Sequence, residues 1–539
     1  MIIRELSWQL SSLAIASLVF FPLVTLLWVS VDANLEVLTH LAATVLQDYV
    51  TTSILLMVGV AILTLCVGVG SAWLVTHFRF TGDSIFSWAL LLPLAVPTYI
   101  TAYSYTGLLD VAGPIQSYIR QFFEIGVGDY WFPEIRSLNG AIFVIGFVLY
   151  PYVYLLARSA FMDQSGSLQD VSRLLGFSSK RTFFKITLPI ARPAIVAGVS
   201  LALMETLADF GAVSYFGLST FTTGIFRTWY GLDSVSGAAQ LALMLLSFII
   251  VLMVIEKHSR KRSGYQSKMR KQPRHTTKLV GASNAIAFTL ALTPVLLGFI
   301  LPMLQLIVWS VQTHAALYTA AFWSLVANTL GLASVTTTIA LFLALIIAYA
   351  NRLAPNRVTS FSKRVAGLGY AVPGTIIAVG TLIPLARLDN TIDAWFRMHF
   401  DLSTGLLLSG TLAALIIAYL VRFLAVALSS IDSGLNSISL NIDYAARSLG
   451  QAPLKSIQKV HIPMLKGSLI TALLIVFVDV MKELPATLIL RPFNFNTLAV
   501  RAYELASDER LMDASLASLF IVLAGLVPVI LLTKASVKR

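Results

Sequence analysis

The sequence predicts an all-α polytopic membrane protein of about twelve transmembrane helices, arranged as two parallel six-helix repeats. Of the 539 residues, 57% are hydrophobic and only 12% are charged, a balance that a water-soluble domain could not cover with polar surface. Apolar runs of about 20 residues, long enough to cross a bilayer, recur along the chain, and such segments satisfy their own backbone hydrogen bonds as helices. The third observation is an internal repeat, described below.

The apolar runs place six spans in each half of the chain. The first six are expected near residues 12–31, 51–76, 85–108, 141–161, 194–216 and 237–255, and the second six near 285–309, 324–350, 365–385, 405–424, 468–490 and 511–532. The chain therefore divides into a first half (1–255), a linker (256–283) and a second half (284–539). The first span leads into further spans, so we expect an anchor and not a cleaved signal. The single Cys66 excludes an internal disulfide and a cysteine-built metal site.

Basic residues gather after every second crossing, which predicts that those segments and both termini are cytoplasmic. The clearest case is the linker stretch Glu256–Lys278, with nine Lys or Arg against one acid. We interpret it as a solvated joint that fixes orientation and contacts lipid headgroups. The net charge of +12 then results from the concentration of basic residues in the cytoplasmic segments. Nucleic acid is not expected as a partner, because the basic residues do not form one groove-like face.

The internal repeat is carried by two separate landmarks. Gly176 and Pro189 return as Gly450 and Pro463 at an offset of 274 residues, and Ala95-Val96-Pro97 returns as Ala371-Val372-Pro373 at an offset of 276. Because each half has an even number of spans, both copies have the same orientation. They should be related by an axis along the membrane normal, with a passage between them.

The first landmark lies in two polar, basic loops, DVSRLLGFSSKRTFFKITLP (170–189) and YAARSLGQAPLKSIQKVHIP (444–463). A short helix is expected to end at each glycine, which takes the left-handed conformation without strain. A second short helix should follow, with Ser178 or Ser179 as its cap in the first copy and Pro453 in its first turn in the second. We expect Pro189 and Pro463 to interrupt the backbone pattern before the chain re-enters the membrane.

These loops resemble the signature of the transmembrane subunits of ATP-binding cassette (ABC) importers, which reads Glu-Ala-Ala, three residues, Gly and later Leu-Pro or Ile-Pro. Both first positions depart from that pattern, while the glycine-to-proline spacing keeps it. The resemblance implies a type I ABC importer-like fold in which each loop is a coupling helix docked on an ATPase subunit; the alternative is an ordinary amphipathic loop. The resemblance implies as ATPase-coupling residues Asp170, Arg173, Gly176, Leu188 and Pro189 in the first copy, and Ala445, Ala446, Arg447, Gly450, Ile462 and Pro463 in the second.

The chain contains no G-x-x-x-x-G-K-[ST] phosphate loop, so we expect that it is not an enzyme and has no cofactor of its own. The resemblance implies that ATP and Mg²⁺ are bound by two copies of a separate cytoplasmic ABC ATPase subunit, one per loop. It also implies a periplasmic substrate-binding protein, the bacterial inner membrane as the location and one fused chain per complex.

The segments 201–230 and 478–506 closely resemble the fused permeases of periplasmic ferric-iron importers, which implies ferric iron as the cargo. Within the importer class, the alternative cargoes are thiamine, a polyamine or an oxyanion. A secondary transporter driven by an ion gradient, or a channel, is the alternative from a different class.

Four carboxylates are the candidate substrate-path and metal-contacting residues. Glu205 and Asp209 lie four residues apart in the fifth span, and Asp479 and Glu483 lie four apart in the eleventh, again at an offset of 274. The spacing predicts that each pair shares one helical face, near mid-membrane, where ionisable groups usually face a bundle interior or a wet cavity. Hard oxygen ligands suit a trivalent cation. The alternative is that they join neighbouring helices, with Lys482 neutralising Asp479 or Glu483.

Three tyrosines beside Pro97 are weaker candidates for the substrate path: Tyr99, Tyr103 and Tyr105. They either line that path or lie at the membrane interface. The outside segments 110–139, 387–403 and 491–510 mix both charges. We expect them to be landing surfaces for a binding protein.

Overall fold

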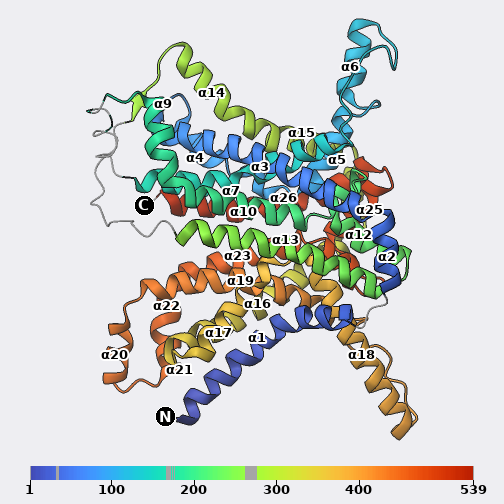
Figure 1. Cartoon of the computed structure of the whole chain (residues 1–539), viewed down its shortest axis with the longest axis vertical. Helices are drawn as coiled ribbons and strands as arrows, with labels where there is room; N and C mark the ends of the chain where they lie inside the picture. The colour runs from blue at the N-terminus through green and yellow to red at the C-terminus, as the bar shows by residue number, and fades with distance from the viewer. Residues whose placement is uncertain are drawn as a thin grey trace. The chain divides into compact units, whose positions relative to one another are not determined.

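A computed structural model describes residues 2–31, 35–164, 172, 174, 176–261 and 276–537. Helices make up nearly all of the regular structure in these ranges (Figure 1). Ten of the described helices are long and apolar enough to cross a membrane, and two bent helix pairs raise the number to as many as twelve. The all-α polytopic fold predicted from the sequence is therefore confirmed.

One of the twelve expected spans is broken, and a second bend lies at the start of another. The third consists of residues 83–95 and 98–123, which meet at an angle of 93° at Pro97, and a bend of 70° between residues 457–464 and 466–481 lies just before the expected eleventh span. At Pro97 the break follows from the missing N–H of proline and from the extended backbone at Val96 (φ −100°, ψ 117°) that a following proline favours.

The chain folds into two compact units that do not coincide with the halves of the sequence. Unit 1 comprises Met1–Leu38, Ile225–Leu243 and Ala315–Arg501, and unit 2 comprises Thr39–Gly224, Met244–His314 and Ala502–Arg539. Helices α2, α12, α13 and α25 have residues in both units. Their bounds are Leu35–Thr44, Phe221–Phe226, Val235–Lys261 and Leu498–Ser507.

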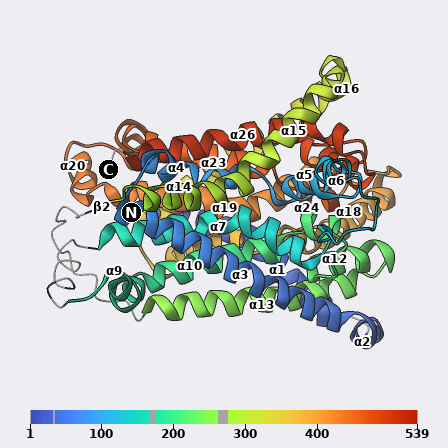
Figure 2. The same cartoon turned by 90° about the horizontal axis from the view of Figure 1, so that it is seen from above.

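Unit 2 is built around α3 (Leu46–His77), α7 (Leu138–Asp163) and α10 (Leu188–Ala208), which run side by side (Figures 1 and 2). Tyr150, Tyr154 and Phe161 of α7 lie fully buried in their shared core. The other elements are β1 (Phe78–Arg79), α4 (Asp83–Ala89), η1 (Leu92–Ala95), α5 (Thr98–Leu109), α6 (Pro114–Phe123), α9 (Ser179–Thr182), η2 (Phe183–Thr187), α11 (Gly211–Tyr215), β2 (Thr277–Lys278), α14 (Ala282–Val295), η4 (Leu296–Ile300), α15 (Leu301–Gln312) and α26 (Leu511–Val537).

Unit 1 is built around α16 (Ala320–Leu353), α19 (Leu412–Ser437) and α23 (Lys466–Met481), which pack against one another. The other elements are α1 (Ile2–Val31), η3 (Arg227–Gly231), η5 (His314–Tyr318, beginning one residue before the unit), α17 (Arg357–Ala366), η6 (Gly369–Ala371), α18 (Gly374–Phe400), α20 (Leu440–Ser448), α21 (Pro453–Ser456), η7 (Ile457–His461), α22 (Ile462–Met464) and α24 (Pro485–Leu490). In Figure 1, α20 and α21 lie at one end of this unit and the C-terminal part of α18 extends from the other.

The first span of each half packs within the other half's unit. Helix α1 packs against α16, α17 and α18 in unit 1, whereas α14 and α15 pack against α3, α4 and α5 in unit 2. The last helix, α26, also lies in unit 2, beside α15 (Figure 2). The division into sequence halves at the linker stays a prediction about the repeat, because packing groups the spans differently.

The repeat is visible in the helix boundaries. Each bound of α19 lies 274 residues after that of α7, and the helix caps are matched: Ser137 accepts a hydrogen bond from Gly140 N, and Thr411 accepts one from Ala413 N. The Ala-Val-Pro landmark has the same backbone in both copies, since Val372 (φ −90°, ψ 123°) resembles Val96 and a helix begins directly after each proline. The two copies therefore share local structure as well as sequence.

The end of the basic linker is attached to the loop after α3. Thr277 and Lys278 pair in parallel with Phe78 and Arg79, and the Asn284 side chain accepts a hydrogen bond of 2.8 Å from Thr81 N. The linker therefore returns to the segment whose basic residues predict a cytoplasmic position.

Candidate functional site

Both glycine landmarks end a helical turn in the same way. Gly176 and Gly450 each have φ +73°. Phe177 N donates to Ser172 O at 2.9 Å, and Gln451 N donates to Ala446 O at 3.0 Å, which is the pattern of a Schellman cap with glycine in the left-handed conformation. The expectation for both glycines is confirmed. Asp170 and Arg173 of the first copy lie outside the described residues, as does the side chain of Arg447, which belongs to α20.

The segments after the two glycines have identical boundaries in the repeat numbering. Helices α9 and α21 are followed by π-helical turns, η2 and η7, and then by helices that begin at Leu188 and Ile462. Ser178 accepts a hydrogen bond from Arg181 N at 3.4 Å and caps α9, while Pro453 is the first residue of α21. The predicted second short helix is thus confirmed in both copies.

Pro189 does not interrupt its helix as expected, whereas a break of 70° follows two residues after Pro463, at the end of α22. The chain passes each proline in helical conformation, because a wide π-turn precedes it: Leu188 N bonds to Phe183 O, and Ile462 N bonds to Ile457 O. The π-turn removes the collision that a proline ring makes with a carbonyl four residues earlier in a regular α-helix. In the first copy the result is a continuous helix into the membrane, from Lys180 to Ala208.

The second loop is anchored to the end of α16 by a buried ion pair that sequence reasoning missed. Arg352 Nη2 lies 2.7 Å from Asp443 Oδ2, and the two side chains are only 9% and 8% exposed. The same guanidinium donates to Leu435 O at 2.6 Å and to Ile438 O at 3.0 Å. The sequence offers one hint of this ion pair, because the acidic Asp443 directly precedes the motif that begins at Tyr444.

The first loop is anchored by aromatic rings instead. Phe183 of η2 packs against Trp73 near the end of α3 at 4.7 Å between ring centroids, and against Phe161 of α7 at 6.5 Å. Trp73 corresponds in the repeat to Tyr349 of α16, whose ring stacks on His461 of η7 at 5.5 Å. In both units the loop is therefore joined to the preceding α3 or α16 helix at an equivalent position.

The expectation that each carboxylate pair shares one helical face is wrong. Helix α10 ends at Ala208 and α23 ends at Met481, so Asp209 and Glu483 follow their helices. The physical reason is that each side chain caps the next short helix: Asp209 Oδ1 accepts from Ala212 N at 2.9 Å, and Glu483 Oε1 accepts from Ala486 N at 3.1 Å. Acidic side chains are favoured at a helix start, where backbone N–H groups lack partners.

The two carboxylate pairs differ in their neutralisation. In unit 1, Lys482 Nζ lies 2.8 Å from Asp479 and Arg422 Nη1 lies 3.2 Å from Glu483. The corresponding positions of the first copy are Ala208 and Val148. In unit 2, Asp209 Oδ2 accepts a hydrogen bond from Thr98 Oγ1, and within the described part of the chain neither Glu205 nor Asp209 forms an ion pair.

Both pairs lie beside the helix that follows the Ala-Val-Pro break. Thr98 is the first residue of α5, and Gly374, its counterpart, is the first residue of α18. A Cβ on Gly374 would lie 2.4 Å from Glu483 Oε1 and 2.6 Å from Arg422 Nη1, so glycine is required for the ion pair to approach. Among the described residues, no group of three or more His, Cys, Asp and Glu side chains is placed to hold a metal ion.

The tyrosines next to Pro97 are buried in unit 2. Tyr103 hydrogen-bonds Ser518 of α26, and Tyr105 OH donates to Leu297 O at 2.5 Å. Both therefore join α5 to helices from the second half of the sequence.

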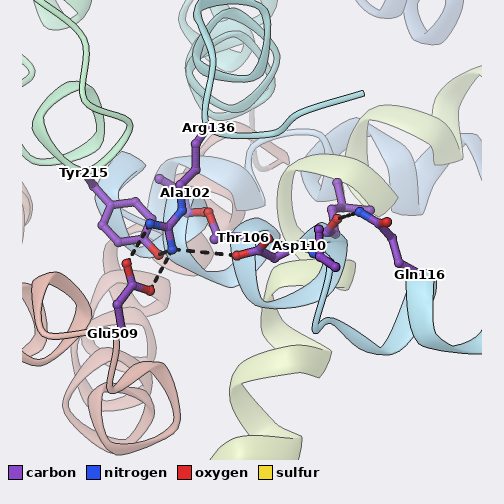
Figure 3. Close-up of polar contacts among 9 residues, drawn as sticks. Ala102, Thr106, Asp110, Gln116, Arg136, Tyr215 and Glu509 are labelled. Atoms are coloured by element: carbon purple, nitrogen blue, oxygen red, sulfur yellow. Dashed lines mark hydrogen bonds and ion pairs between the residues drawn. The ribbon is translucent and has the colours of Figure 1, made fainter. Parts of the chain in front are cut away.

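Two of the expected outside segments meet in a polar cluster in unit 2 (Figure 3). Arg136 binds both oxygens of Glu509, at 2.6 and 2.7 Å, and lies 3.8 Å from Asp110 and 3.3 Å from the Tyr215 hydroxyl. Glu509 has φ +60° in the turn before α26. The cluster closes one end of the unit by joining chain segments nearly 400 residues apart.

This cluster gives a pH-dependent prediction. The hydrogen bond from Arg136 lowers the pKa of Glu509, so its contribution to stability is complete above the ordinary pKa of about 4.3 and is lost as the pH falls through the lowered value. Because the Glu509 side chain is 59% exposed, we expect a contribution of at most about 1 kcal/mol. Thermal unfolding between pH 6 and 3 should show a steeper loss of stability for the wild type than for Glu509→Gln; parallel curves would contradict it.

Gly176 and Gly450 give a second prediction. A Cβ at Gly176 or Gly450 meets no atom within 4 Å, so substitution by valine costs only the strain of the left-handed backbone, about 1–2 kcal/mol at each site. We expect the double variant to lose its shape at both loops and to fail to co-purify an ATPase subunit. Valine at Gly331 and Gly467, which also have open space but lie within helices, is the matched control and should retain the subunit. Retention by both variants would contradict the docking role.

Known transport permeases resemble this chain over most of its length. Residues 64–264, which include the loop at 170–189 and α10, match the family described as binding-protein-dependent transport system inner membrane component. The chain is 27% identical to the Fe(3+)-transport system permease protein FbpB 2 of Haemophilus influenzae over 498 residues, which cover 92% of this chain and 91% of that protein. It is 24% identical to the putative ferric transport system permease protein FbpB 1 of the same organism, over 84% of this chain and 72% of that protein.

A shorter part of the chain is similar in sequence to another group of permeases. The molybdenum transport system permease protein ModB of Haemophilus influenzae is 29% identical over 34% of this chain and 78% of its own length. The family matched by residues 64–264 implies a binding protein and an ATPase as partners, with ATP bound by the ATPase and no cofactor on the permease itself. Residues 64–264 match the binding-protein-dependent transport system inner membrane components, and together with the likeness to ferric transport permeases over most of the chain this supports a multi-pass, non-catalytic permease of an ABC importer.

Proposed function

We propose that this permease moves ferric iron from a periplasmic binding protein into the cytoplasm by alternating access. The observation that carries the proposal is the likeness to two ferric transport permeases over most of the chain, since the likeness to the molybdenum permease covers only about a third of it. Both halves of the sequence take part in the longer likeness. The proposal therefore concerns the cargo of a complete two-half permease.

The unequal neutralisation of the carboxylate pairs supports a cationic cargo. Lys482 and Arg422 balance the second pair, while Glu205 lies close enough to Asp209 to add to its negative field. Partly exposed acids within a bundle usually face a polar passage. Of the four candidates, Glu205 and Asp209 are thus the ones that attract the cation, and Asp479 and Glu483 contribute chiefly to the packing of the second copy.

An oxyanion is the second candidate cargo, because the molybdenum and sulfate permeases are among the relatives. Two unbalanced carboxylates repel an oxyanion, so the charge of the first copy speaks against it. Thiamine and polyamines are cations and agree with the charge, but not with the full-length likeness.

A cargo panel tests the proposal directly. The permease, its ATPase and its binding protein are reconstituted in liposomes and offered ferric ion, molybdate, thiamine and spermidine in turn. We expect stimulation of ATP hydrolysis and uptake only with ferric ion. If another compound of the panel stimulates ATP hydrolysis and uptake and ferric ion does not, that compound and not ferric iron is the cargo.

The contacts that anchor the two loops support a route by which movement of the ATPase subunits is transmitted to the membrane-spanning helices. Two loops require two ATPase subunits, so one fused chain serves one complex. Closure of the ATPase pair on ATP pulls the loops together, and each loop moves its attached helix, α3 through Trp73 and α16 through Arg352. The proposal has the loops, the linker and both termini in the cytoplasm, and the distribution of basic residues supports this orientation.

A further inference from the structure

Unit 1 contains a cavity that the transport mechanism does not use. Its volume is about 770 Å³, and it is formed by the last turns of α1, the segment from Trp229 to Ser236, the middle of α18 and the loop that follows α18. It lies toward the C-terminal part of α18, the end of the unit away from α20 and α21 (Figure 1). On the orientation proposed above, that end faces the periplasm.

A basic side chain in this cavity is held in place without being neutralised. The guanidinium carbon of Arg387 lies 4.3 Å from the centroid of the Trp28 ring, and Arg387 forms no ion pair within the described ranges. Trp28 lies one turn before the end of α1 and is half exposed. Tryptophan at the end of a span is typical of the membrane–water interface, so Arg387 is placed at the depth of lipid headgroups.

An acidic side chain lines the same cavity. Asp233 has φ +49° in the turn before α13, and the structure records no ion pair for it in the described part of the chain. Arg387 and Asp233 are therefore more than 4.0 Å apart and do not neutralise each other. A cavity with two separate, opposite and unpaired charges matches a ligand that carries both an anionic and a cationic group.

The remaining walls divide into an apolar and a polar part. Val29, Leu382, Ile383 and Ala386 supply apolar surface, and polar groups come from Ser234, Ser236, Asn390 and Ser409. An apolar wall at interface depth with a polar rim suits an amphiphile better than a soluble ion or an extended protein segment.

We propose that this cavity binds a phospholipid with a phosphoethanolamine headgroup. The phosphate pairs with Arg387, whose guanidinium forms bidentate hydrogen bonds to phosphate oxygens, and the ammonium group pairs with Asp233. The upper parts of the acyl chains lie along the apolar wall. The bound lipid fills the space between α1 and α18 and joins the first span of the chain to the second half's helices.

Native mass spectrometry of the full chain, purified without its partners and titrated with defined lipids, tests the proposal. For the wild type we expect tighter binding of phosphatidylethanolamine than of phosphatidylglycerol. Arg387→Gln should weaken both lipids roughly tenfold or more, the effect of losing charge-assisted hydrogen bonds. Asp233→Asn, which keeps a residue tolerant of positive φ, should remove the preference while phosphatidylglycerol still binds.

Arg510→Gln is the matched control, because Arg510 forms an exposed ion pair with Asp513 in unit 2, and it should bind both lipids as the wild type does. Equal binding of the two lipids to the wild type, or unchanged binding to Arg387→Gln, would overturn the proposal. If soluble glycerophosphoethanolamine competes with the lipid, the ligand of the cavity is a soluble zwitterion and not a phospholipid. If Arg387→Gln instead lost affinity for the binding protein and kept its lipid, the cavity would be a protein contact. No cargo is present, so failure here leaves the proposed iron transport standing.

Discussion

Replacement of Arg352 by alanine is expected to abolish ATP-driven uptake and to lower the free energy of unfolding by about 3–5 kcal/mol, the usual cost of removing one partner of a buried ion pair. The substitution leaves Asp443 buried without its cation and removes the donors to Leu435 O and Ile438 O. The second loop then loses its ion pair with α16 and retains the stacking of His461 on Tyr349. Denaturation of the purified protein and uptake in liposomes measure the two effects.

The ion pair between Lys363 and Asp432 provides the matched control. It joins α17 to α19 in the same unit at 2.5 Å, but its side chains are 26% and 25% exposed. Lys363→Ala should cost about 1 kcal/mol or less and should preserve uptake. An Arg352→Ala protein that unfolds and transports as the wild type does would show that the loop is held by other contacts.

The second large effect is expected from the acid pair of the first copy. Glu205→Gln combined with Asp209→Asn should reduce ferric uptake roughly tenfold or more, since an interaction with a charged group is typically worth about 1.5–3 kcal/mol. Asparagine preserves the cap on α11, because its side-chain oxygen accepts the same hydrogen bonds. Folding, assembly with the ATPase and basal ATP hydrolysis should therefore be unchanged, and the loss should appear only in uptake.

Asp479→Asn is the corresponding variant of the second copy. Its charge is already balanced by Lys482, so we expect uptake within about twofold of the wild type, well below the effect of losing an unbalanced charge. A larger loss from Asp479→Asn than from the Glu205 and Asp209 substitutions would reverse the assignment. Normal uptake by the first-copy variant would exclude its carboxylates from the path.

Local features with a strong backbone requirement could be predicted from the sequence. The glycines at 176 and 450 and the Ala-Val-Pro segments gave the helix ends and breaks, because left-handed φ and proline restrict the backbone wherever they occur. The spans followed from hydropathy, except that the third is bent and a second bend lies just before the eleventh. The helix ends at Ala208 and Met481 were missed because the apolar runs continue past them.

Contacts between distant segments could not be predicted. Nothing near Arg352 shows that its partner is Asp443, and nothing near Arg136 indicates Glu509. Hydropathy also cannot show that α1 packs with helices of the second half, since each span is apolar whichever neighbour it has. The neutralisation of Glu483 by Arg422 depends on the packing of α19 beside α24, which a single sequence does not reveal.

Transport by the reconstituted permease with and without its ATPase is the most direct measurement. Liposomes that contain the chain, the binding protein and ferric ion should take up iron only when the ATPase subunit and ATP are both present, and an imposed proton or sodium gradient should not replace them. Iron accumulation by the chain alone, driven by such a gradient, would contradict the account.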